Sequence, residues 1–277
     1  MIAAKKERID VLLVEKGFFS SREKAKAAIM AGIVFVDEER IEKPGMKVAA
    51  DAAVRVKGAV HPYVGRGGLK LEHAIKHFNL DLNGAVMLDI GASTGGFTDC
   101  ALQHGAAYVY AIDVGYNQLD WSLRKDERVC VMERTNFRYM KPEDITGPKP
   151  NFAAIDVSFI SLQKIFPPLK EIFQTYGGGK AAALIKPQFE TGPENVGKSG
   201  IVKDQNIHVD VLLQVLSFTK EQGWSCEGLT YSPIKGGEGN IEFLGLFAFG
   251  LETSHSEERV DESTIRQTVE QAHRNLQ

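Results

Sequence analysis

The sequence predicts an α/β fold in which helices flank a doubly wound, mostly parallel sheet, with a smaller α+β module ahead of it. Short, continuously apolar segments alternate with helical ones between residues 86 and 249, which is typical of a sheet covered on both faces. The first of these segments, Val86–Ile90, runs directly into a glycine-rich stretch, as an opening strand of such a sheet does. With 277 residues, 43% of them hydrophobic, the chain can bury more than one core, so disorder of the whole chain is excluded.

The first sixty residues predict two helices that lead into a small hairpin. Apolar spacing over residues 8–16 predicts a short amphipathic helix that ends at Gly17. A capping-box pattern that begins at Ser20 predicts a second helix, which stops at Gly32. The β-branched run over residues 33–36 and the acidic turn behind it predict the hairpin.

Charge alone does not identify a partner for this chain. The net charge is −3, and within it residues 1–60 are basic, with 12 Lys and Arg against 9 Asp and Glu. An excess this small indicates nucleic acid only if the cations converge on one face.

Four motifs spread over residues 8–48 characterise the amino-terminal module: Arg-x-Asp-x-x-Leu-x-x-x-Gly, Ser-Arg-x-x-Ala, Ile-x-x-Gly-x-Val-x-Val and Lys-Pro-Gly. Together they resemble the S4 RNA-binding domain. The resemblance implies that Arg8, Arg22 and Lys26 contact RNA phosphates. One departure is the acidic turn at residues 37–39, where the family has Asn-Gly, because it puts negative charge near the expected contact surface. The alternative is that these cations only solubilise a small helix.

A candidate nucleotide site lies at the glycine-rich stretch. Glycines there let the backbone approach a ligand, and the next strand, residues 108–113, ends in a carboxylate that can accept hydrogen bonds from ribose hydroxyls. Dinucleotide enzymes have a similar loop, but the missing Gly-x-Gly-x-x-Gly pattern and the acid before the first glycine favour S-adenosylmethionine. A tight turn without a ligand is the alternative. The residues predicted to bind this cofactor are Asp89, Gly91, Ala92, Ser93, Gly95, Gly96, Asp113, Asn136 and Asp156.

Two of the surrounding residues have equally simple explanations. Asn136 follows a predicted strand and is placed to contact adenine, yet an exposed loop asparagine explains it as well. Phe159 is placed to line the crevice, but such a residue more often belongs to the core.

The rest of the larger module continues the alternation of strands and helices. Strands are expected over residues 129–133, 152–157, 181–186 and 242–249, and helices near residues 97–104, 117–124, 161–174 and 206–222. Four charged residues then stand at element ends or edges, where an open sheet binds its ligands. They are Lys70 before the first strand, Asp156 and Lys186 at the carboxyl ends of two strands, and Glu242 at the start of the last strand.

The order Lys-Asp-Lys-Glu, in the contexts Gly-Gly-Leu-Lys, Ile-Asp-Val-Ser, Leu-Ile-Lys-Pro and Asn-Ile-Glu-Phe, resembles the FtsJ-like RNA ribose 2′-O-methyltransferases. Together with the S4 motifs, Gly-Ala-Ser-Thr-Gly-Gly-Phe-Thr and Lys-Pro-Gln-Phe-Glu make the chain similar to the TlyA, or haemolysin A, family from residue 8 to about residue 250. The resemblance implies a Rossmann-like class I methyltransferase that uses S-adenosylmethionine. It also implies ribosomal RNA or ribosomal subunits as the partner, with cytidine as the target.

The four charged residues suit the chemistry of this reaction. A ribose 2′-hydroxyl is a poor acid, so its proton must be withdrawn or stabilised as the oxygen attacks. We therefore assign Lys186 as the candidate base or hydroxyl-orienting group, Lys70 as its electrostatic partner, and Asp156 and Glu242 as the groups that orient the lysines. A lysine that stays charged would instead stabilise the developing alkoxide. The alternative is that all four make ordinary surface ion pairs.

The chain is expected to divide into an S4 domain at residues 1–60, a linker at 61–64, a methyltransferase domain at 65–250 and a polar, acidic tail at 251–277. The tail shows weak helical periodicity, so it is either a peripheral helix or a frayed end. A long polar loop over residues 187–205 follows Lys186, and its Lys198 and Lys203 are candidate RNA contacts. An uninvolved loop is the alternative.

Several function classes receive no support. The three cysteines are odd in number and far apart, which favours neither a disulfide framework nor a zinc site, and no metal is expected. The sequence has no apolar leader and no apolar run long enough for a span, so we expect a cytoplasmic protein without membrane partners. The same observation argues against membrane lysis. A non-catalytic RNA-binding assembly factor remains the main alternative to an enzyme.

Overall fold

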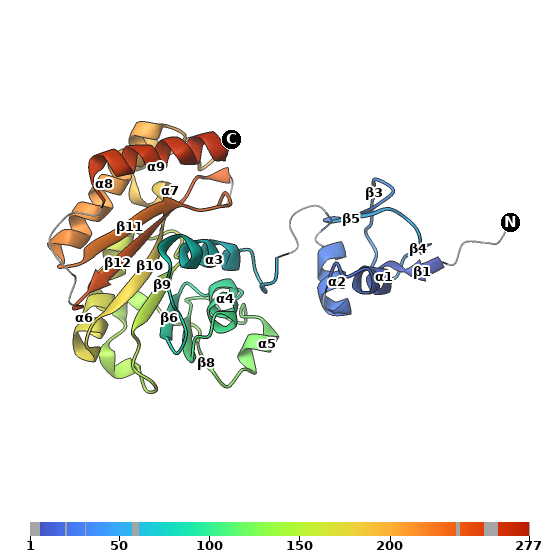
Figure 1. The fold of residues 1–277 in the computed structure, drawn as a ribbon, viewed down its shortest axis with the longest axis horizontal. Coiled ribbons are helices and arrows are strands. Elements are labelled where there is room, and N and C mark those ends of the chain that lie inside the picture. Colours follow the sequence, from blue (N-terminus) through green and yellow to red (C-terminus); the bar gives the residue numbers. More distant parts are fainter. Residues whose placement is uncertain are drawn as a thin grey trace. The chain divides into compact units, whose positions relative to one another are not determined.

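The computed structural model describes residues 6–19, 21–30, 32–56, 61–236, 239–251 and 260–276 (Figure 1). The chain forms two compact units, Met1–Pro62 and Tyr63–Gln277. Each unit has its own hydrophobic core. No helix in the described part of the chain is long and apolar enough to cross a membrane.

The first unit has the predicted two helices and hairpin. Its elements are β1 (Lys6–Arg8), α1 (Ile9–Glu15), α2 (Arg22–Met30), β2 (Val34–Val36), β3 (Glu39–Arg40), β4 (Lys47–Ala49) and β5 (Val54–Val56). Strand β1 pairs with β4, and β2 lies between β3 and β5. The helices bury Ile9, Leu13 and Ile29 between them and the strands, so their apolar stripes form the core of this unit.

The cap of α2 and the acidic turn of this unit differ from what the sequence predicts. The amide of Lys24 donates to Ser21 Oγ at 3.3 Å, so Ser21 caps α2, while Ser20 lies outside the described residues. In the acidic turn Asp37 and Glu38 have φ angles of 50° and 66°, the left-handed conformation for which hairpins normally use Asn-Gly. Glu38 pairs with Arg55 at 2.5 Å, so part of the negative charge of the turn is neutralised within the unit.

The second unit is a seven-stranded sheet with helices on both faces. Its helices are α3 (Gly67–Phe78), α4 (Gly96–Gln103), α5 (Trp121–Arg124), α6 (Phe166–Tyr176), α7 (Pro187–Glu190), α8 (Gln205–Glu221) and α9 (Glu262–Asn275), with 3-10 turns at Phe137–Tyr139, Pro142–Asp144, Leu162–Lys164 and Pro193–Asn195. Its strands are β6 (Val86–Ile90), β7 (Tyr108–Ile112), β8 (Val129–Met132), β9 (Phe152–Ile155), β10 (Gly179–Ile185), β11 (Ser225–Tyr231) and β12 (Phe243–Phe249).

The strand order is β11-β12-β10-β9-β6-β7-β8. The five strands from β8 to β10 are parallel, and β12 runs antiparallel to both of its neighbours. The prediction of a mostly parallel sheet covered on both faces is therefore confirmed. The reversal at β12 places its first residues at the edge of the sheet where the parallel strands end.

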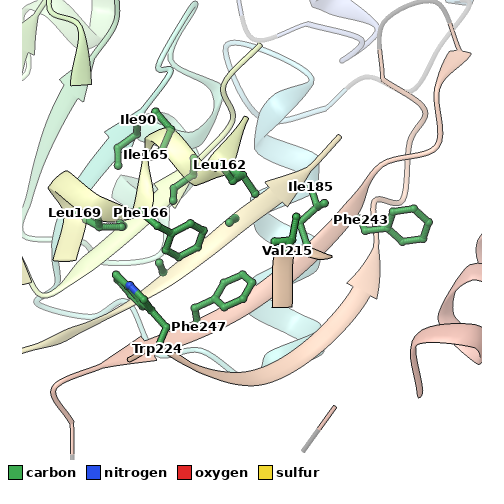
Figure 2. Packing of buried hydrophobic residues seen from close by; sticks show 14 of the residues in the cluster. Ile90, Leu162, Ile165, Phe166, Leu169, Ile185, Val215, Trp224, Phe243 and Phe247 are labelled. Carbon is green, nitrogen blue, oxygen red and sulfur yellow. The ribbon is translucent and has the colours of Figure 1, made fainter. Parts of the chain in front are cut away.

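The two faces of the sheet have separate cores. Helices α3 and α4 cover one face, where Leu71 and Ile75 pack near Met87. Helices α6, α8 and α9 cover the other face (Figure 1). There the ring of Phe166 meets those of Trp224 and Phe247, each at 5.0 Å between centroids (Figure 2). Such edge-to-face contacts add to the burial that holds α6 on the sheet.

Helices α3 and α7 and strand β11 are not among the elements that the sequence predicts, and for the tail the sequence leaves a helix and a frayed end open. Helix α3 begins with two glycines and carries lysine and histidine among its apolar residues, which hides its helical pattern. Strand β11 is polar, lies at the edge of the sheet and has a bulge between Cys226 and Gly228. The tail forms α9, whose Asp261 side chain caps its first turn and whose Ile265 and Val269 are buried, so the helical alternative is the one observed.

Candidate active site

The register of the sheet brings the predicted site residues together at the carboxyl ends of its parallel strands. In neighbouring strands Ile90 pairs with both Ile112 and Ile155, so Gly91, Asp113 and Asp156 leave three adjacent strands at the same level. Open α/β sheets bind their ligands at the carboxyl ends of the strands, where these three residues lie.

The same register explains why Lys186 and Glu242 approach each other. Ile185, the last residue of β10, pairs with Phe243, the first residue of β12. The residues just outside this pair are therefore neighbours, although 56 positions separate them in the chain. An antiparallel strand beginning where a parallel strand ends is what places this acid among the lysines.

Lys70, Asp156, Lys186 and Glu242 form one cluster, here called the charged tetrad. Lys186 Nζ lies 2.5 Å from Asp156 Oδ1, Lys70 Nζ lies 3.6 Å from Asp156 Oδ2, and Lys70 Nζ lies 2.7 Å from Glu242 Oε2. Acid and amine thus alternate along the cluster. Lys70, Lys186 and Glu242 are buried, so the alternative of four unrelated surface ion pairs is wrong.

Ser158, the last residue of the Ile-Asp-Val-Ser context, has no role assigned from the sequence and also contacts the tetrad. Lys186 Nζ donates to Ser158 Oγ at 3.0 Å, in addition to its ion pair with Asp156. An amine has three substituent positions besides its carbon chain. Two of those of Lys186 are engaged by the protein, which leaves the third for another group.

Phe159 is exposed, contrary to the expectation that it belongs to the core. Its side chain is 90% accessible, and its φ of 62° lies in the left-handed region that an aromatic residue seldom adopts. Its ring lies 5.0 Å from that of Phe189, three residues beyond Lys186. Glu190 fastens this segment, since it accepts hydrogen bonds from Ser161 Oγ at 2.6 Å and from the Leu162 amide at 2.8 Å.

Asp113 organises the loop beside the tetrad. Its Oδ2 accepts a hydrogen bond from the Ser93 amide at 2.7 Å, and its Oδ1 accepts one from the Gly115 amide at 2.7 Å. The carboxylate is partly exposed, so it retains acceptor capacity toward solvent or a ligand.

The glycines of the loop allow other parts of the protein to pack closely against it. A Cβ on Gly91 would lie 2.4 Å from the carbonyl oxygen of Asp156, and one on Gly95 would lie 2.3 Å from Leu123. A Cβ on Gly96 would lie 2.8 Å from the Gly68 amide nitrogen, at the start of α3. Protein atoms therefore fill the space on the Cβ side of these glycines, so close packing of the protein explains each glycine. Contacts from the loop backbone remain a prediction.

Ala92 and Asn136 flank this region in different ways. Ala92 is buried within the core below the loop. Asn136 is exposed, and its Oδ1 accepts from the Arg138 amide at 3.2 Å, which caps the 3-10 turn Phe137–Tyr139. Capping explains the asparagine locally, and contact with adenine remains a prediction.

Asp89 is a fully buried acid below the loop. Its Oδ2 accepts from the amide and the hydroxyl of Thr98, at 2.9 and 2.6 Å. Its Oδ1 has no hydrogen-bond partner among the described residues. Burial raises the pKa of Asp89 to about 7 against these hydrogen bonds, with smaller contributions from Asp156 and Asp113. The site therefore holds a buried acceptor that requires either a proton or a donor.

This acid predicts a pH dependence of stability. Because the pKa of Asp89 rises from 3.8 to about 7 on folding, the unfolding free energy should decrease as the pH rises through 7, by about 1 kcal/mol between pH 6 and 8. Asp89→Asn should remove this component. Urea unfolding without cofactor at pH 6, 7 and 8 measures it, with exposed Asp81→Asn as the matched control. Parallel pH curves for the wild type and Asp89→Asn would contradict the assignment.

Two of the predicted RNA contacts are engaged inside the first unit. Asp10 is fully buried, and its carboxylate pairs with Arg8 at 2.9 Å and with Arg22 at 2.9 Å. Both arginines are about half exposed, so each can still present part of its guanidinium to a phosphate. Lys26, on the same helix as Arg22, is partly exposed.

The Asp10 cluster should stabilise the first unit. Hydrogen bonding to Arg8 lowers the pKa of Asp10 well below its usual range, burial opposes this, and Arg22 adds to it. The stabilisation is therefore present above about pH 4 and is lost as the pH falls toward the depressed value. We expect Asp10→Asn to lower the stability of this unit by roughly 2 kcal/mol. Hydrogen exchange of α1 and α2 amides in the full chain measures it, and exposed Asp51→Asn should have no effect.

The long loop after Lys186 is partly structured. It contains α7 and the 3-10 turn Pro193–Asn195, and Lys198 and Lys203 are exposed on its second half. Among the described residues no group of three or more His, Cys, Asp or Glu side chains is arranged to hold a metal ion.

Comparison with known proteins identifies the two domains of the chain. The FtsJ-like methyltransferase family model matches residues 63–249, and the S4 domain model matches residues 7–54. A candidate rRNA methyltransferase of Bacillus subtilis (strain 168), YqxC, is 55% identical over 275 residues, which cover 99% of this chain and 97% of the relative.

Two further relatives extend the comparison. The 16S/23S rRNA (cytidine-2′-O)-methyltransferase TlyA of Mycobacterium tuberculosis (strain CDC 1551 / Oshkosh) is 41% identical over 242 residues, covering 87% of this chain and 89% of the relative. A solved structure of a candidate hemolysin from Streptococcus thermophilus has a TM-score of 0.76 and 49% identity, covering 99% of this chain and 98% of the other. The chain therefore belongs to the TlyA family of FtsJ-like methyltransferases and carries an S4 domain ahead of its methyltransferase domain.

Proposed function

We propose that this protein is an S-adenosylmethionine-dependent 2′-O-methyltransferase that modifies a ribose of ribosomal RNA, with cytidine as the target nucleoside. The charged tetrad carries the proposal, because it gathers two amines and two acids at the ligand-binding edge of the sheet. Relatives named as rRNA methyltransferases support the substrate, and one of those names specifies cytidine. The S4 domain supports an RNA partner, and the proposal places the enzyme in the cytoplasm with the ribosomes.

Lys186 is the residue that we assign to the ribose hydroxyl. Asp156 and Ser158 engage two positions of its amine, so the third faces the substrate. In the neutral amine this position holds the lone pair, which can accept the hydroxyl proton. In the charged amine it holds a third N–H, which can stabilise the developing alkoxide. Both states hold the hydroxyl oxygen beside the same position of the amine, with the hydroxyl as donor in the first and as acceptor in the second.

Lys70 and the two acids set the position and the charge of Lys186. Asp156 is shared between the two lysines, so its negative charge is not concentrated on Lys186 alone. Lys70 is held in turn by buried Glu242 at 2.7 Å. The tetrad is thus a rigid, desolvated arrangement, the setting in which electrostatic effects on a reacting group are strongest.

The cofactor site is proposed at the adjoining loop. When bound, S-adenosylmethionine supplies an electrophilic methyl group on its sulfonium. Asp89, the loop over residues 91–96 and Asp113 are the groups that would hold it. The fit rests on Asp89 Oδ1, a buried and unpaired acceptor that suits an amino group as donor. The partly exposed carboxylate of Asp113 suits ribose hydroxyls.

Asp113→Ala should lower the affinity for S-adenosylmethionine much more than it lowers the rate of methyl transfer. We expect binding to be roughly 10- to 100-fold weaker, because two charge-assisted hydrogen bonds to the ribose are lost. Methyl transfer at saturating cofactor should change much less. Isothermal titration calorimetry measures the affinity, and Asp210→Ala, which removes an exposed carboxylate from α8, is the control. An unchanged dissociation constant would show that Asp113 only organises the loop.

The ring contact between exposed Phe159 and partly exposed Phe189 supports a single-stranded or unstacked target. Aromatic rings beside a catalytic group provide faces on which an RNA base can stack. Phe159 lies three residues after Asp156, and Phe189 three residues after Lys186. The pair is therefore placed to receive the base of the nucleotide whose ribose reaches the tetrad.

Transfer of labelled methyl from the cofactor to ribosomal RNA tests the proposed function. Purified protein is incubated with ribosomal subunits, and nucleosides from the digested RNA are analysed by mass spectrometry. We expect label in 2′-O-methylcytidine. Label on a base instead of a ribose would overturn the reaction assignment. RNA binding without label would favour a non-catalytic assembly factor.

A further inference from the structure

Two histidines outside the tetrad, one fully buried and one partly exposed, connect the carboxyl-terminal helix to the loop after Lys186. His273 Nε2 on α9 lies 2.9 Å from His208 Nδ1 on α8, and His208 Nε2 lies 3.1 Å from the carbonyl oxygen of Val202. His208 is fully buried. Neither residue has a part in the proposed methyl transfer.

The chemistry of these contacts fixes the hydrogen positions. A carbonyl oxygen only accepts, so His208 Nε2 must carry the hydrogen that faces Val202. In the neutral ring His208 Nδ1 is then an acceptor, and His273 Nε2 must donate to it. The two rings therefore form a directed chain of donors that ends on the backbone of the loop.

The histidine pair is built to remain neutral. Burial lowers the pKa of His208 to about 4, and His273 adds to this effect, while the Val202 carbonyl and Asp204 oppose it. Burial also lowers the pKa of His273, where Asp204 acts in the opposite direction and Lys235 in the same direction. A second proton on His208 would place two N–H groups against each other. At neutral pH the donor chain is thus intact.

Val202 is the point at which the loop is fixed. Its carbonyl is held by His208, and its amide donates to Asn240 Oδ1 at 3.0 Å. Asn240 also donates through Nδ2 to the Gly200 carbonyl at 2.9 Å. A tight turn precedes it, in which the Gly200 amide donates to Gly197. Hydrogen bonds with His208 on α8 and with Asn240, two residues before Glu242, therefore hold the segment 197–203, here called the basic loop.

The basic loop presents its two cations to solvent. Lys198 and Lys203 are exposed on either side of buried Val202. A fixed backbone lowers the entropy that the loop loses when its cations bind phosphates. Helix α9 holds His273 in place because Ile265, Val269 and Ala272 are buried against its neighbours α8 and β11 (Figure 1).

We propose that His273 is a positioning residue for RNA binding, which acts through His208 to fix Val202 and so the basic loop with Lys198 and Lys203. The inference rests on the proposed function for its RNA partner, but the ordering of the loop is independent of that function. The carboxyl-terminal helix is then part of the substrate-binding machinery.

Limited trypsin digestion of the full chain tests the ordering of the loop. Trypsin cleaves after lysine, so mass spectrometry of early time points reports cleavage at Lys198 and Lys203. We expect His273→Leu to accelerate these cuts roughly tenfold, the effect of one lost buried hydrogen bond on local opening. His273→Gln should restore the wild-type rate, because its amide nitrogen can donate in place of Nε2. Arg274→Leu, on the exposed neighbouring residue, is the matched control.

Methylation kinetics test the consequence for RNA. His273→Leu should raise KM for ribosomal subunits severalfold, leave kcat within twofold and leave cofactor affinity unchanged, and His273→Gln should reverse the rise in KM. Unchanged cleavage in His273→Leu overturns the proposal, as does faster cleavage with unchanged KM. If the wild type transfers no methyl to RNA, the proposed function fails, and subunit binding measured with the same variants replaces KM in deciding the role of His273.

Discussion

Lys186→Met is expected to reduce methyl transfer to ribosomal RNA by a factor of about 1000 or more. Methionine keeps the length and apolar stem of lysine, so it fills the buried position, but it removes the amine that we assign to the ribose hydroxyl. Cofactor affinity should stay within about twofold, because Lys186 belongs to the tetrad and not to the cofactor loop. Single-turnover transfer of labelled methyl measures the chemical step, and calorimetry measures cofactor binding.

Lys180→Met supplies the control for Lys186. Lys180 lies near the amino end of β10, whereas Lys186 follows its carboxyl end. The amine of Lys180 pairs with Glu227 at 2.7 Å. Its replacement should leave turnover unchanged. Full turnover by Lys186→Met on ribosomal subunits would refute the role assigned to Lys186. Loss of cofactor binding together with transfer would show that the residue acts on the fold of the site instead.

Asp156→Asn should give the second largest loss, about 100- to 1000-fold in kcat. The amide keeps the shape of the side chain but removes the charge shared by Lys70 and Lys186. Glu242 still neutralises Lys70, so the loss falls mainly on the position and charge of Lys186. Because Asp156 also belongs to the predicted cofactor residues, cofactor affinity must be measured beside kcat.

Asp126→Asn is the matched control for the effect of Asp156→Asn on kcat and cofactor affinity. Asp126→Asn removes a carboxylate that pairs with Arg128 in the same unit, remote from the tetrad in the sheet order. It should leave kcat and affinity unchanged. If Asp156→Asn weakened the cofactor without lowering kcat, the acid would belong to the cofactor site alone, and the shared-charge role would be wrong.

The sequence predicted the parallel part of the sheet well because each strand carries its own signal. Continuous apolar runs bounded by turn residues mark β6, β7, β9 and β10 locally. Helix α3 and strand β11 lack such runs, because each is stabilised by packing on a single face and has many polar residues. Their existence depends on tertiary contacts, which no local pattern records.

The members of the site could be named from the sequence, but their arrangement could not. The resemblance to the methyltransferase family indicated Lys70, Asp156, Lys186 and Glu242, whereas their distances follow from strand register. Ser158 lies in the quoted context Ile-Asp-Val-Ser, but the motif does not say that its hydroxyl contacts Lys186, which follows only from the folded backbone. For Phe159 the sequence leaves a position lining the crevice and a position in the core open, and its exposed side chain shows that only the core alternative is wrong.

The contact between Lys70 and Glu242 has a consequence for biosynthesis. The two residues are 172 positions apart, and the strand that begins just after Glu242 is inserted between β10 and β11. During translation the Lys70 amine therefore lacks its nearer counterion until residue 242 has been synthesised and has left the ribosome. A chain terminated before Glu242 would leave the Lys70 ammonium group with only the more distant Asp156 carboxylate, at 3.6 Å and shared with Lys186, which disfavours its compact state. Completion of the polypeptide and assembly of the reactive centre are thereby the same event, and truncated products remain open to degradation.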